Sequence, residues 1–330
     1  MDAALIFPGQ GSQAVGMGQA LFASVPAARA VFEEVDAALG EPLSRLIFEG
    51  PEERLRLTEN AQPALMATSM AALRALEARS GRTIEELCRF VAGHSLGEYS
   101  ALAAAGSLSI GDAARLLRLR GQAMQTAVPV GEGAMAAVLG LDLAEVEAIA
   151  AEASKAGVCE VGNDNAPGQA VVSGARAAVE RAVEIAKAKG ARSMMLPVSA
   201  PFHCRLMAPA ADAVHAALAE IELCAPVVPV VTNVTAAPER DPTSLAALLV
   251  RQVTARVRWR ESLQALGNHG IATTVELGSR RVLSGLVKRT LEGVAIEALG
   301  APEEIDAYVA TLPSRMPAKA PGAARRAAAG

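Results

Sequence analysis

The sequence predicts an α/β fold with a largely parallel sheet and a smaller inserted domain. Strand and helix signals alternate from the first residues, a pattern typical of parallel strands joined by helices. The middle of the chain instead follows the order βαββαβ, which is typical of a ferredoxin-like unit. The chain has 330 residues, of which 52% are apolar, so it can bury a substantial core as one large domain or two.

The large domain is predicted over residues 1–130 and 199–312. It begins with a short apolar strand, Ala3–Phe7, which runs into a Gly/Ser loop, Pro8–Ser12. Residues 88–93 form a second predicted strand, which leads to Ser95. The other expected elements are helices at 16–39, 61–79, Gly97–Ala105 and 112–127, with Pro63 early in the first turn of the second helix, and strands at Val227–Asn233 and Thr273–Leu277.

The small domain is predicted over residues 131–198. Its elements are strand Ala134–Leu139, helix Ala144–Lys155, strands Val158–Gly162 and Gln169–Ser173, helix Ala175–Lys189 and strand Arg192–Val198. The large domain resumes near Ser199, so we expect two lobes with a cleft between them. Residues 313–330 are rich in Pro, Ala, Gly and basic residues without apolar periodicity, which predicts a disordered tail.

Composition and charge exclude several classes of protein. A net charge of −4, with one Trp, two Tyr and six Phe, excludes a globally basic nucleic-acid binder that stacks bases on aromatic rings. The start of the chain lacks a basic segment, and its apolar stretch is too short for a signal peptide or membrane span, which predicts a cytoplasmic protein. The cysteines show no metal-ligand spacing and are expected to be reduced and mostly buried: Cys88, Cys159, Cys204 and Cys224.

The strongest chemical signal is the segment Gly93-His94-Ser95-Leu96-Gly97. It fits the G-x-S-x-G nucleophile elbow and lies between a predicted strand and a predicted helix, where that motif belongs. The two glycines suit the sharp turn, because a side chain there would crowd the neighbouring strand or helix. The turn would present the Ser95 hydroxyl near a helix N-terminus, with the amide of Leu96 directed at a developing oxyanion. The alternative is an ordinary Gly/Ser turn that caps a helix.

A serine nucleophile needs a base, and the chain has four histidines. His94 is adjacent to Ser95, so its side chain should point away from the hydroxyl. His215 lies in a helical run and His269 at a helix end, where structural roles suffice. His203 follows the last strand of the small domain, at the predicted lip of the cleft, and is the expected base.

The loop after the first strand, Gly9-x-Gly11-x-x-Ala14, also matches a degenerate dinucleotide-binding fingerprint. That fingerprint requires an acidic residue at the end of a second strand about 20 positions on. The acidic residues in that region are Glu33, Glu34 and Asp36, which lie in a helical stretch. The loop therefore suits an oxyanion hole better, because glycines let backbone N–H groups approach a reacting carbonyl.

Arg120 is the clue to the substrate. In the helix predicted at 112–127 it falls on the apolar stripe, away from the polar stripe that holds Arg115 and Arg118. An arginine there either extends to the surface or meets an anion in a pocket, since an unpaired buried charge is costly. In the second case the substrate carries a carboxylate that the guanidinium grips with two hydrogen bonds.

Several ordered motifs together resemble the malonyl-CoA:acyl carrier protein transacylase family. They are Phe7-Pro8-Gly9-Gln10-Gly11-Ser12-Gln13, the elbow with Glu98-Tyr99-Ser100, Arg120-Gly121 with Met124-Gln125, Asn163-x-Asn165-x-Pro167-Gly168-Gln169, Pro201-x-His203 and Val250-Arg251-Gln252. The resemblance implies a hydrolase-like α/β domain with a ferredoxin-like insertion. It also implies that Ser95 is acylated, His203 is the general base and Arg120 holds the substrate carboxylate.

The same resemblance implies supporting roles. The backbone amides of Gln10 and Leu96 would form the oxyanion hole, and the main-chain carbonyl of Gln252 would orient His203. Phe202 is expected to line the acyl pocket, and Asn165 and Gln252 are also expected to be substrate-binding residues. The substrates would be malonyl-CoA and a phosphopantetheinylated acyl carrier protein, with no metal or redox cofactor, in a two-step exchange through a malonyl-serine ester.

This chain departs from the family pattern at one turn. Where the family commonly reads Glu-Leu-Gly-Pro-Gly-Lys, this chain has Glu276-Leu277-Gly278-Ser279-Arg280-Arg281, which leaves any backbone role of the missing proline and glycine in question. Three other functions stay open: a free-standing acyltransferase of a polyketide synthase, a serine thioesterase or hydrolase, and a binding module without activity.

Basic side chains cluster in two stretches that suit an acidic partner. In this family's pathways the carrier protein is small and acidic, so an enzyme of net negative charge needs a local basic surface. The first stretch is Arg251, Arg256, Arg258 and Arg260. The second, which we call the basic patch, is Arg280, Arg281, Lys288 and Arg289. The alternative is a set of ordinary solvated charges.

Overall fold

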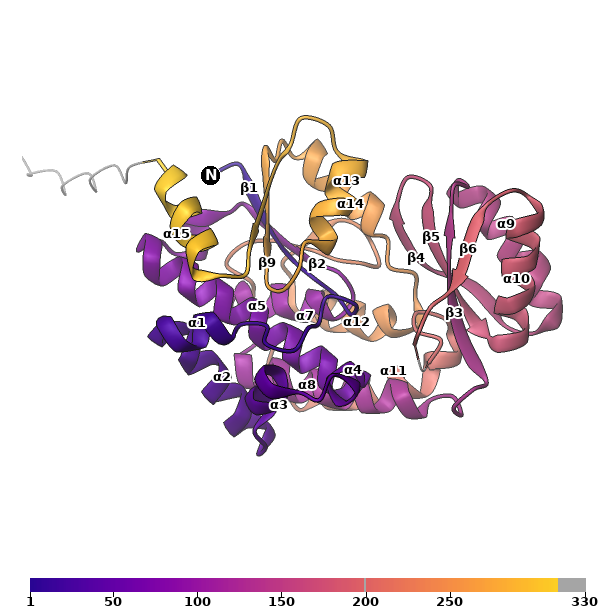
Figure 1. Ribbon diagram of the computed structural model, residues 1–330, viewed down its shortest axis with the longest axis horizontal. Helices are drawn as coiled ribbons and strands as arrows, with labels where there is room; N and C mark the ends of the chain where they lie inside the picture. Colours follow the sequence, from indigo (N-terminus) through magenta and orange to yellow (C-terminus); the bar gives the residue numbers. More distant parts are fainter. Residues whose placement is uncertain (199, 314–330) are drawn as a thin grey trace, which may run out of the picture.

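The computed structural model describes residues 1–198 and 200–313. It shows two lobes side by side, a larger one built on a parallel sheet and a smaller one built on an antiparallel sheet (Figure 1). The predicted fold class is confirmed. The predicted tail falls almost entirely on residues 314–330, outside the described residues. In the described part of the chain, no helix has the length and apolar character needed to cross a bilayer.

The larger sheet has six strands in the order β10-β9-β1-β2-β7-β8. The strands are β1 (Ala3–Phe7), β2 (Phe90–Gly93), β7 (Val230–Val231), β8 (Pro238–Glu239), β9 (Thr273–Leu277) and β10 (Ala295–Leu299). All adjacent pairs are parallel except β7 and β8, which is the arrangement that the alternation of strands and helices predicts. Three expectations differ: the strand expected at Val227–Asn233 is only two residues long, and neither β8 nor β10 was expected.

The strand register brings two loops together at one edge of this sheet. Phe7 pairs with Gly93, the last residues of β1 and β2. The amide of His94 then donates to the carbonyl of Phe7 at 3.0 Å. Because parallel strands end at the same edge, the Gly-rich loop after β1 and the turn after β2 lie next to each other.

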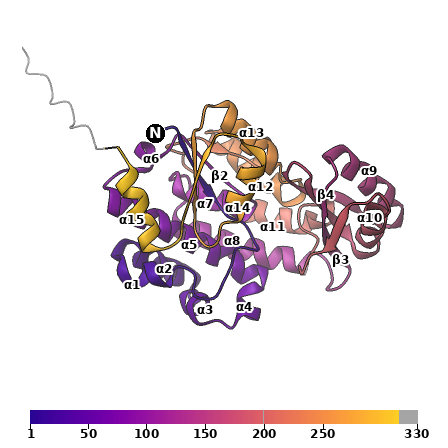
Figure 2. The same cartoon turned by 45° about the horizontal axis from the view of Figure 1, so that its top comes forward.

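Helices cover both faces of the larger sheet (Figures 1 and 2). They are α1 (Gln19–Ser24), α2 (Pro26–Leu39), α3 (Leu43–Glu49), α4 (Glu52–Arg56), α5 (Thr58–Ser80), α6 (Ile84–Leu87), α7 (Leu96–Ala104), α8 (Ile110–Thr126), α11 (Ala208–Ala219), α12 (Pro242–Thr254), α13 (Trp259–Asn268), α14 (Val282–Thr290) and α15 (Pro302–Thr311). A short helix, η2 (Arg205–Met207), precedes α11.

Two of the predicted helices differ by more than two residues, or by a break, from their expected boundaries. The helix expected at 16–39 is interrupted at Val25, whose backbone is extended because the next residue is Pro26. The helix expected at 61–79 begins at Thr58, so Pro63 lies in its second turn. It begins earlier because the amides of Asn60 and Ala61 already bond to the carbonyl of Leu57.

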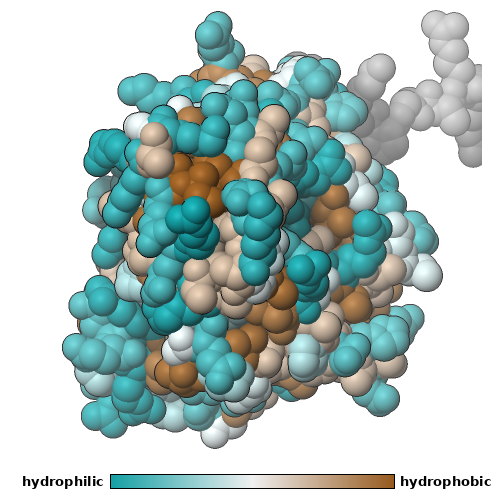
Figure 3. Space-filling model, turned by 90° about the vertical axis from the view of Figure 1, so that its right-hand side faces the viewer, coloured by the Kyte–Doolittle hydropathy of each residue, from teal (hydrophilic) through white to brown (hydrophobic). Residues whose placement is uncertain are grey.

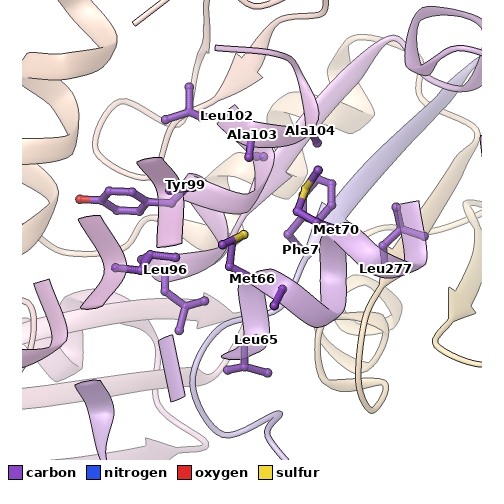
Figure 4. Packing of buried hydrophobic residues seen from close by; sticks show 14 of the residues in the cluster. Phe7, Leu65, Met66, Met70, Leu96, Tyr99, Leu102, Ala103, Ala104 and Leu277 are labelled. Atoms are coloured by element: carbon purple, nitrogen blue, oxygen red, sulfur yellow. The ribbon is translucent and has the colours of Figure 1, made fainter. Parts of the chain in front are cut away.

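The core of the larger lobe lies between α5, α7 and the sheet. Most side chains of α5 are buried from Thr58 to Leu76, so this helix is apolar or shielded on every side. Figure 4 shows Leu65, Met66 and Met70 of α5 near Leu96 and Tyr99 of α7, with Phe7 and Leu277 contributed by the sheet. This packing holds the start of α7 against the ends of β1 and β2.

The smaller sheet has the strand order β4-β5-β3-β6, with every pair antiparallel. Its elements are β3 (Gly133–Leu139), α9 (Leu143–Ala153), η1 (Ser154–Ala156), β4 (Cys159–Ala166), β5 (Gln169–Ala175), α10 (Arg176–Ala188) and β6 (Arg192–Met195). Helices α9 and α10 lie together on the face turned away from the larger lobe. Hydrophilic side chains cover most of the exterior seen in Figure 3, with apolar patches between them.

Strand β4 joins the two lobes. It runs past the predicted end at Gly162 to Ala166, with register irregularities after Val161 and Asp164. The amide of Asp164 donates to the carbonyl of Val257 at 2.9 Å, and the amide of Val257 donates to the carbonyl of Gly162 at 2.8 Å. These hydrogen bonds couple the small sheet to the segment between α12 and α13.

The glycines around Ser95 are required by the close approach of α7 to the sheet. A Cβ atom on Gly93 would lie 1.8 Å from the carbonyl oxygen of Gly97, and one on Gly97 would lie 2.2 Å from that of Phe7. Both contacts are with backbone atoms, which cannot move aside as a flexible side chain would. The turn therefore accepts no larger residue at either position.

Gly93→Ala should lower the free energy of unfolding by about 3 kcal/mol or more, because the added methyl group overlaps backbone atoms. Urea denaturation followed by circular dichroism measures this change. Gly285→Ala is the matched control, since a Cβ on Gly285 of α14 meets no atom within 4 Å. It should be neutral or stabilising by up to about 1 kcal/mol. Equal effects of the two substitutions would contradict the steric explanation.

Candidate active site

Ser95 lies on a strained turn between β2 and α7. Its backbone adopts φ 53° and ψ −109°, in the left-handed half of conformational space that non-glycine residues rarely occupy. The side chain of Asn233 supports the turn from both sides: its Oδ1 accepts from the Ser95 amide at 2.7 Å, and its Nδ2 donates to the Gly93 carbonyl at 2.7 Å. This geometry is that of a nucleophile elbow, as the motif predicts.

His203 faces Ser95 across the junction of the two lobes. Its Nε2 lies 2.7 Å from the Ser95 Oγ, and its Nδ1 lies 2.9 Å from the carbonyl oxygen of Gln252. A carbonyl can only accept, so Nδ1 carries the proton and Nε2 has a lone pair free to accept from the serine hydroxyl. The ring therefore has the tautomer that a general base for Ser95 needs.

The surroundings keep His203 neutral. Burial, followed by the nearby charge of Arg120, lowers its pKa to about 3. A neutral imidazole is able to take a proton from Ser95. The backbone of His203 is also left-handed, with φ 60°, so both members of the pair have strained conformations.

Arg120 is buried at the floor of the site. Only 1% of its surface is exposed, which excludes the alternative in which it extends to solvent. Its Nη1 donates to Oε1 of Gln62 at 2.6 Å, and its Nη2 donates to Oε1 of Gln252 at 2.8 Å and to Oγ of Ser95 at 3.1 Å. Burial lowers its pKa. Among the described residues no carboxylate forms an ion pair with it.

Gln252 connects the base to the arginine. Its main chain accepts from His203, while its side-chain oxygen accepts from Arg120. Its Nε2 donates to the carbonyl of Ser95 at 3.0 Å and to Oε2 of Glu98 at 2.8 Å. One residue thus fixes the positions of Ser95, His203 and Arg120.

Glu98 is a buried acid beneath the site. Its side chain is fully buried, and its Oε2 also accepts from the amide of Asn233 at 3.0 Å. Burial raises its pKa to about 7, opposed by the hydrogen bond from Gln252. Sequence reasoning missed Glu98, Asn233 and Gln62. Glu98 could have been suspected, because a glutamate on an otherwise apolar helix implies a buried partner.

The Gly-rich loop lies beside the elbow, as predicted. Gln10 and Leu96 both line the cleft that contains Ser95. Within the described residues, neither backbone amide donates a hydrogen bond to the protein. The side chain of Gln10 is held by Thr58, whose hydroxyl donates to it at 2.8 Å. Glu33, Glu34 and Asp36 lie in α2, which agrees with the rejection of a dinucleotide site.

The cleft has a volume of about 410 Å³ and opens between the lobes. Phe202 and Asn165 line it, and Oδ1 of Asn165 bonds to Nε2 of His94 at 2.8 Å. His94 therefore points away from the Ser95 hydroxyl, as expected. In the described part of the chain, no cluster of His, Cys, Asp or Glu is arranged to hold a metal ion.

The cationic residues separate into different environments. Three arginines of the first stretch form ion pairs: Arg256 with Glu147, Arg258 with Glu261 and Arg260 with Asp164. In the basic patch, Arg281 pairs with Glu304 at 3.0 Å and Arg289 donates to Gln169 at 2.7 Å. Only Arg280 of that patch lines the cleft that contains Ser95.

The four cysteines are free thiols, as expected, and none belongs to the site. Cys88, Cys159 and Cys204 are buried and Cys224 is exposed. Burial raises the pKa of Cys204, the neighbour of His203, to about 11. Its sulfur donates to the carbonyl of Pro201 at 3.1 Å, away from Ser95.

Comparison with known proteins gives one consistent picture. The family model described as an acyl transferase domain matches residues 4–313. A malonyl CoA-acyl carrier protein transacylase of Bacillus subtilis is 45% identical over 311 residues, covering 94% of this chain and 96% of that protein.

Solved structures agree in fold. An acyl-carrier-protein S-malonyltransferase of Bartonella henselae has a TM-score of 0.92 at 54% identity, covering 94% of this chain and 99% of that one. A malonyl-transacylase in complex with a type II polyketide acyl carrier protein has a TM-score of 0.90 at 40% identity, covering 94% and 99%.

Proposed function

Because this chain belongs to the acyl transferase domain family, we propose that it moves a malonyl group from malonyl-CoA to the phosphopantetheine thiol of an acyl carrier protein. The reaction type is inferred from two hydrogen bonds of His203, one to the Ser95 hydroxyl and one to the carbonyl of Gln252. The identity of the acyl group is inferred from Arg120. This buried cation has no ion pair with a carboxylate among the described residues, and its Nη2 lies 3.1 Å from the Ser95 Oγ.

The first half-reaction acylates the serine. His203 takes the proton from the Ser95 hydroxyl through Nε2 as the oxygen attacks the malonyl thioester carbon. The backbone amides of Gln10 and Leu96 stabilise the oxyanion of the tetrahedral intermediate. The C–S bond then breaks, the thiolate takes the proton from His203, and free coenzyme A leaves a malonyl ester on Ser95.

The second half-reaction repeats these steps with a different thiol. The phosphopantetheine thiol of the carrier protein gives its proton to His203 and attacks the ester carbonyl. The C–O bond to Ser95 breaks, and the serine oxygen recovers its proton from His203. The histidine needs no acidic partner, because the Gln252 carbonyl already fixes its tautomer. Neither step requires a metal or redox cofactor, so we propose that none takes part.

Arg120 selects the acyl group by its charge. We propose that the malonyl carboxylate accepts hydrogen bonds from the guanidinium, which Gln62 and Gln252 already hold in place. Phe202 limits the space around the acyl group, and Asn165, which bonds to His94, lines the same cleft. A wall of this kind discriminates against one extra methyl group by about 1–3 kcal/mol, so selectivity against methylmalonyl is partial.

We propose that the product supplies fatty-acid elongation. A polyketide pathway is the second candidate, favoured by the similarity to the transacylase solved with a type II polyketide carrier. The two share all of the chemistry above and differ in the carrier protein.

We further propose that Lys288 and Arg289 contribute to docking of the acidic carrier protein. Both are exposed on α14, which packs against β4 at the boundary of the two lobes. Arg289 reaches across that boundary to Gln169. A carrier bound there would lie close to the cleft that its arm must enter.

Ser95→Ala should abolish the malonyl adduct that intact-mass analysis detects after incubation with malonyl-CoA. The substitution removes one hydroxyl and leaves the fold unchanged. Ser100→Ala is the matched control, because Ser100 is buried on α7, the helix that follows Ser95, and its hydroxyl has no partner among the described residues. It should keep the adduct. An adduct that persists without Ser95 would identify a different nucleophile.

Arg120→Ala should lower kcat/KM for malonyl transfer by about 100-fold or more, since the loss of one partner of a buried charge pair costs about 3–5 kcal/mol. Acetyl transfer should be spared, because acetyl has no carboxylate. Arg120→Lys should restore little, since an ammonium group lacks the planar fork.

The control for this experiment is Arg115→Ala, which removes an exposed arginine of the same helix that pairs with Asp112. Its malonyl and acetyl rates should match those of the unmodified enzyme. A parallel loss of both rates in Arg120→Ala would make Arg120 structural.

Reversal of charge at Lys288 and Arg289 to Glu should slow transfer to the carrier protein and weaken its salt dependence. Acylation of Ser95 by malonyl-CoA should change little. Reversal of Arg181 and Lys187 on α10 changes the net charge equally and controls for it. If both reversals slow transfer alike, net charge and not docking is responsible.

A further inference from the structure

Arg280 differs from the rest of the basic patch because it lines the catalytic cleft. We propose that it binds the phosphate of the phosphopantetheine arm, the group that coenzyme A and a holo carrier protein share. This inference rests on the proposed function and names a ligand group and a residue for it.

The charge of Arg280 is available to a ligand. Three arginines line the cleft. Arg56 donates to Glu52 at 2.7 Å, and Arg120 is held at the floor by two glutamines. Arg280 has no ion pair or hydrogen bond to any described residue and is exposed. It is therefore the cation that can meet an anion at the rim of the cleft.

The backbone of Arg280 is held in a strained conformation. Its φ is 64°, in the left-handed region where glycine is favoured. A left-handed non-glycine residue costs of the order of 1 kcal/mol or more. The fold of the turn therefore does not call for arginine, so its presence points to a role for the side chain.

The turn that contains Arg280 is fixed beside the Gly-rich loop after β1. Gly278 is so close to the loop after β1 that a Cβ on it would lie 3.3 Å from a side-chain carbon of Pro8 and 2.8 Å from Oγ of Ser69. The hydroxyl of Ser69 also donates to the carbonyl of Leu277 at 2.8 Å. Arg280 therefore lies two residues after Gly278, whose backbone is held next to the loop that contains Gln10.

The adjacent helix end is not itself an anion site. The carboxylate of Glu276 accepts from the amides of Leu283 and Ser284 at 3.0 and 2.7 Å, and from the Ser284 hydroxyl at 2.7 Å. These bonds occupy the free amides at the start of α14. An anion at this turn is therefore not bound by the amides of Leu283 and Ser284.

The chemistry of the substrates places a phosphate at the outer end of the arm. The thiol or thioester must reach Ser95 at the floor of the cleft, and the phosphate lies at the opposite end of the pantetheine chain. A phosphate is well matched to the planar fork of a guanidinium. Because both substrates carry this group, Arg280 should act in both half-reactions, unlike Lys288 and Arg289.

The test compares acyl donors that differ in phosphate. Rates of Ser95 acylation are measured with malonyl-pantetheine, malonyl-4′-phosphopantetheine, malonyl-dephospho-CoA and malonyl-CoA. The unmodified enzyme should prefer malonyl-4′-phosphopantetheine over malonyl-pantetheine by at least about tenfold in kcat/KM, as expected for a charge-assisted hydrogen bond.

Arg280→Gln should reduce this preference to a few-fold and leave the rate with malonyl-pantetheine unchanged. Arg280→Gly, which suits the left-handed backbone, should do the same and shows that the effect does not come from the new side chain. The matched control is Arg281→Gln, which removes the same charge from the next residue, outside the cleft. It should keep the full preference.

The acceptor half-reaction gives a second readout. With phosphopantetheine and pantetheine as thiol acceptors, Arg280→Gln should again lose the preference for the phosphorylated thiol. Reversal of Lys288 and Arg289 should leave that preference intact, because neither acceptor carries a protein.

The proposal is overturned if the unmodified enzyme shows no phosphate preference, if Arg280→Gln keeps the preference unchanged, or if Arg280→Gln loses rate equally with and without phosphate. A change confined to the ratio of malonyl-CoA to malonyl-dephospho-CoA would reassign Arg280 to the 3′-phosphate of coenzyme A and so also overturn it. If no donor acylates Ser95 at all, the proposed function fails instead.

Discussion

The left-handed backbone of Ser95 is the constraint on which the site depends. The conformation lifts the hydroxyl out of the sheet, and it exists only because the surroundings compensate its strain. Gly93 and Gly97 let α7 approach the strand ends, while Asn233 satisfies an amide and a carbonyl that the sharp turn leaves without a regular partner. Without these contacts an extended or helical backbone would be favoured, and the hydroxyl would lie elsewhere.

Gln252 transmits this constraint to the rest of the site. Its main chain sets the tautomer of His203, and its side chain lies between Arg120 and Glu98. An amide has a donor end and an acceptor end, so a cation on one side and a carboxylate on the other leave it one orientation. Glu98 thereby supports Arg120 without touching it, and the guanidinium forms no ion pair with any described carboxylate.

The two lobes contribute different parts to the chemistry. The larger lobe carries Ser95, the Gly-rich loop that contains Gln10, and Arg120, while the smaller lobe supplies Asn165 from β4. His203 lies in the segment that returns from the smaller lobe, and the hydrogen bonds of β4 to Val257 couple the lobes close to Gln252. A relative movement of the lobes would therefore change the distance between His203 and Ser95.

The sequence by itself determined the features that depend on neighbouring residues. The elbow is one continuous motif, the βαββαβ order follows from local periodicity, and Arg120 is conspicuous because it occupies an apolar position of its helix. His203 could be reached by elimination, because the chain has only four histidines. The choice between a buried and a surface-exposed Arg120 could not be made in this way. Periodicity shows which face of the helix a residue lies on, but not how far its side chain is buried.

Only the tertiary structure decided which distant residues meet. Asn233 lies 138 positions from Ser95, and Gln62 lies 58 positions from Arg120, so no local pattern connects them. The same holds for Arg280 and Arg281. These neighbours look alike in the sequence, but Arg280 lines the cleft and Arg281 pairs with Glu304. Side-chain hydrogen bonds between remote segments form only when the whole core brings those segments together, and a single sequence carries no local record of that distance.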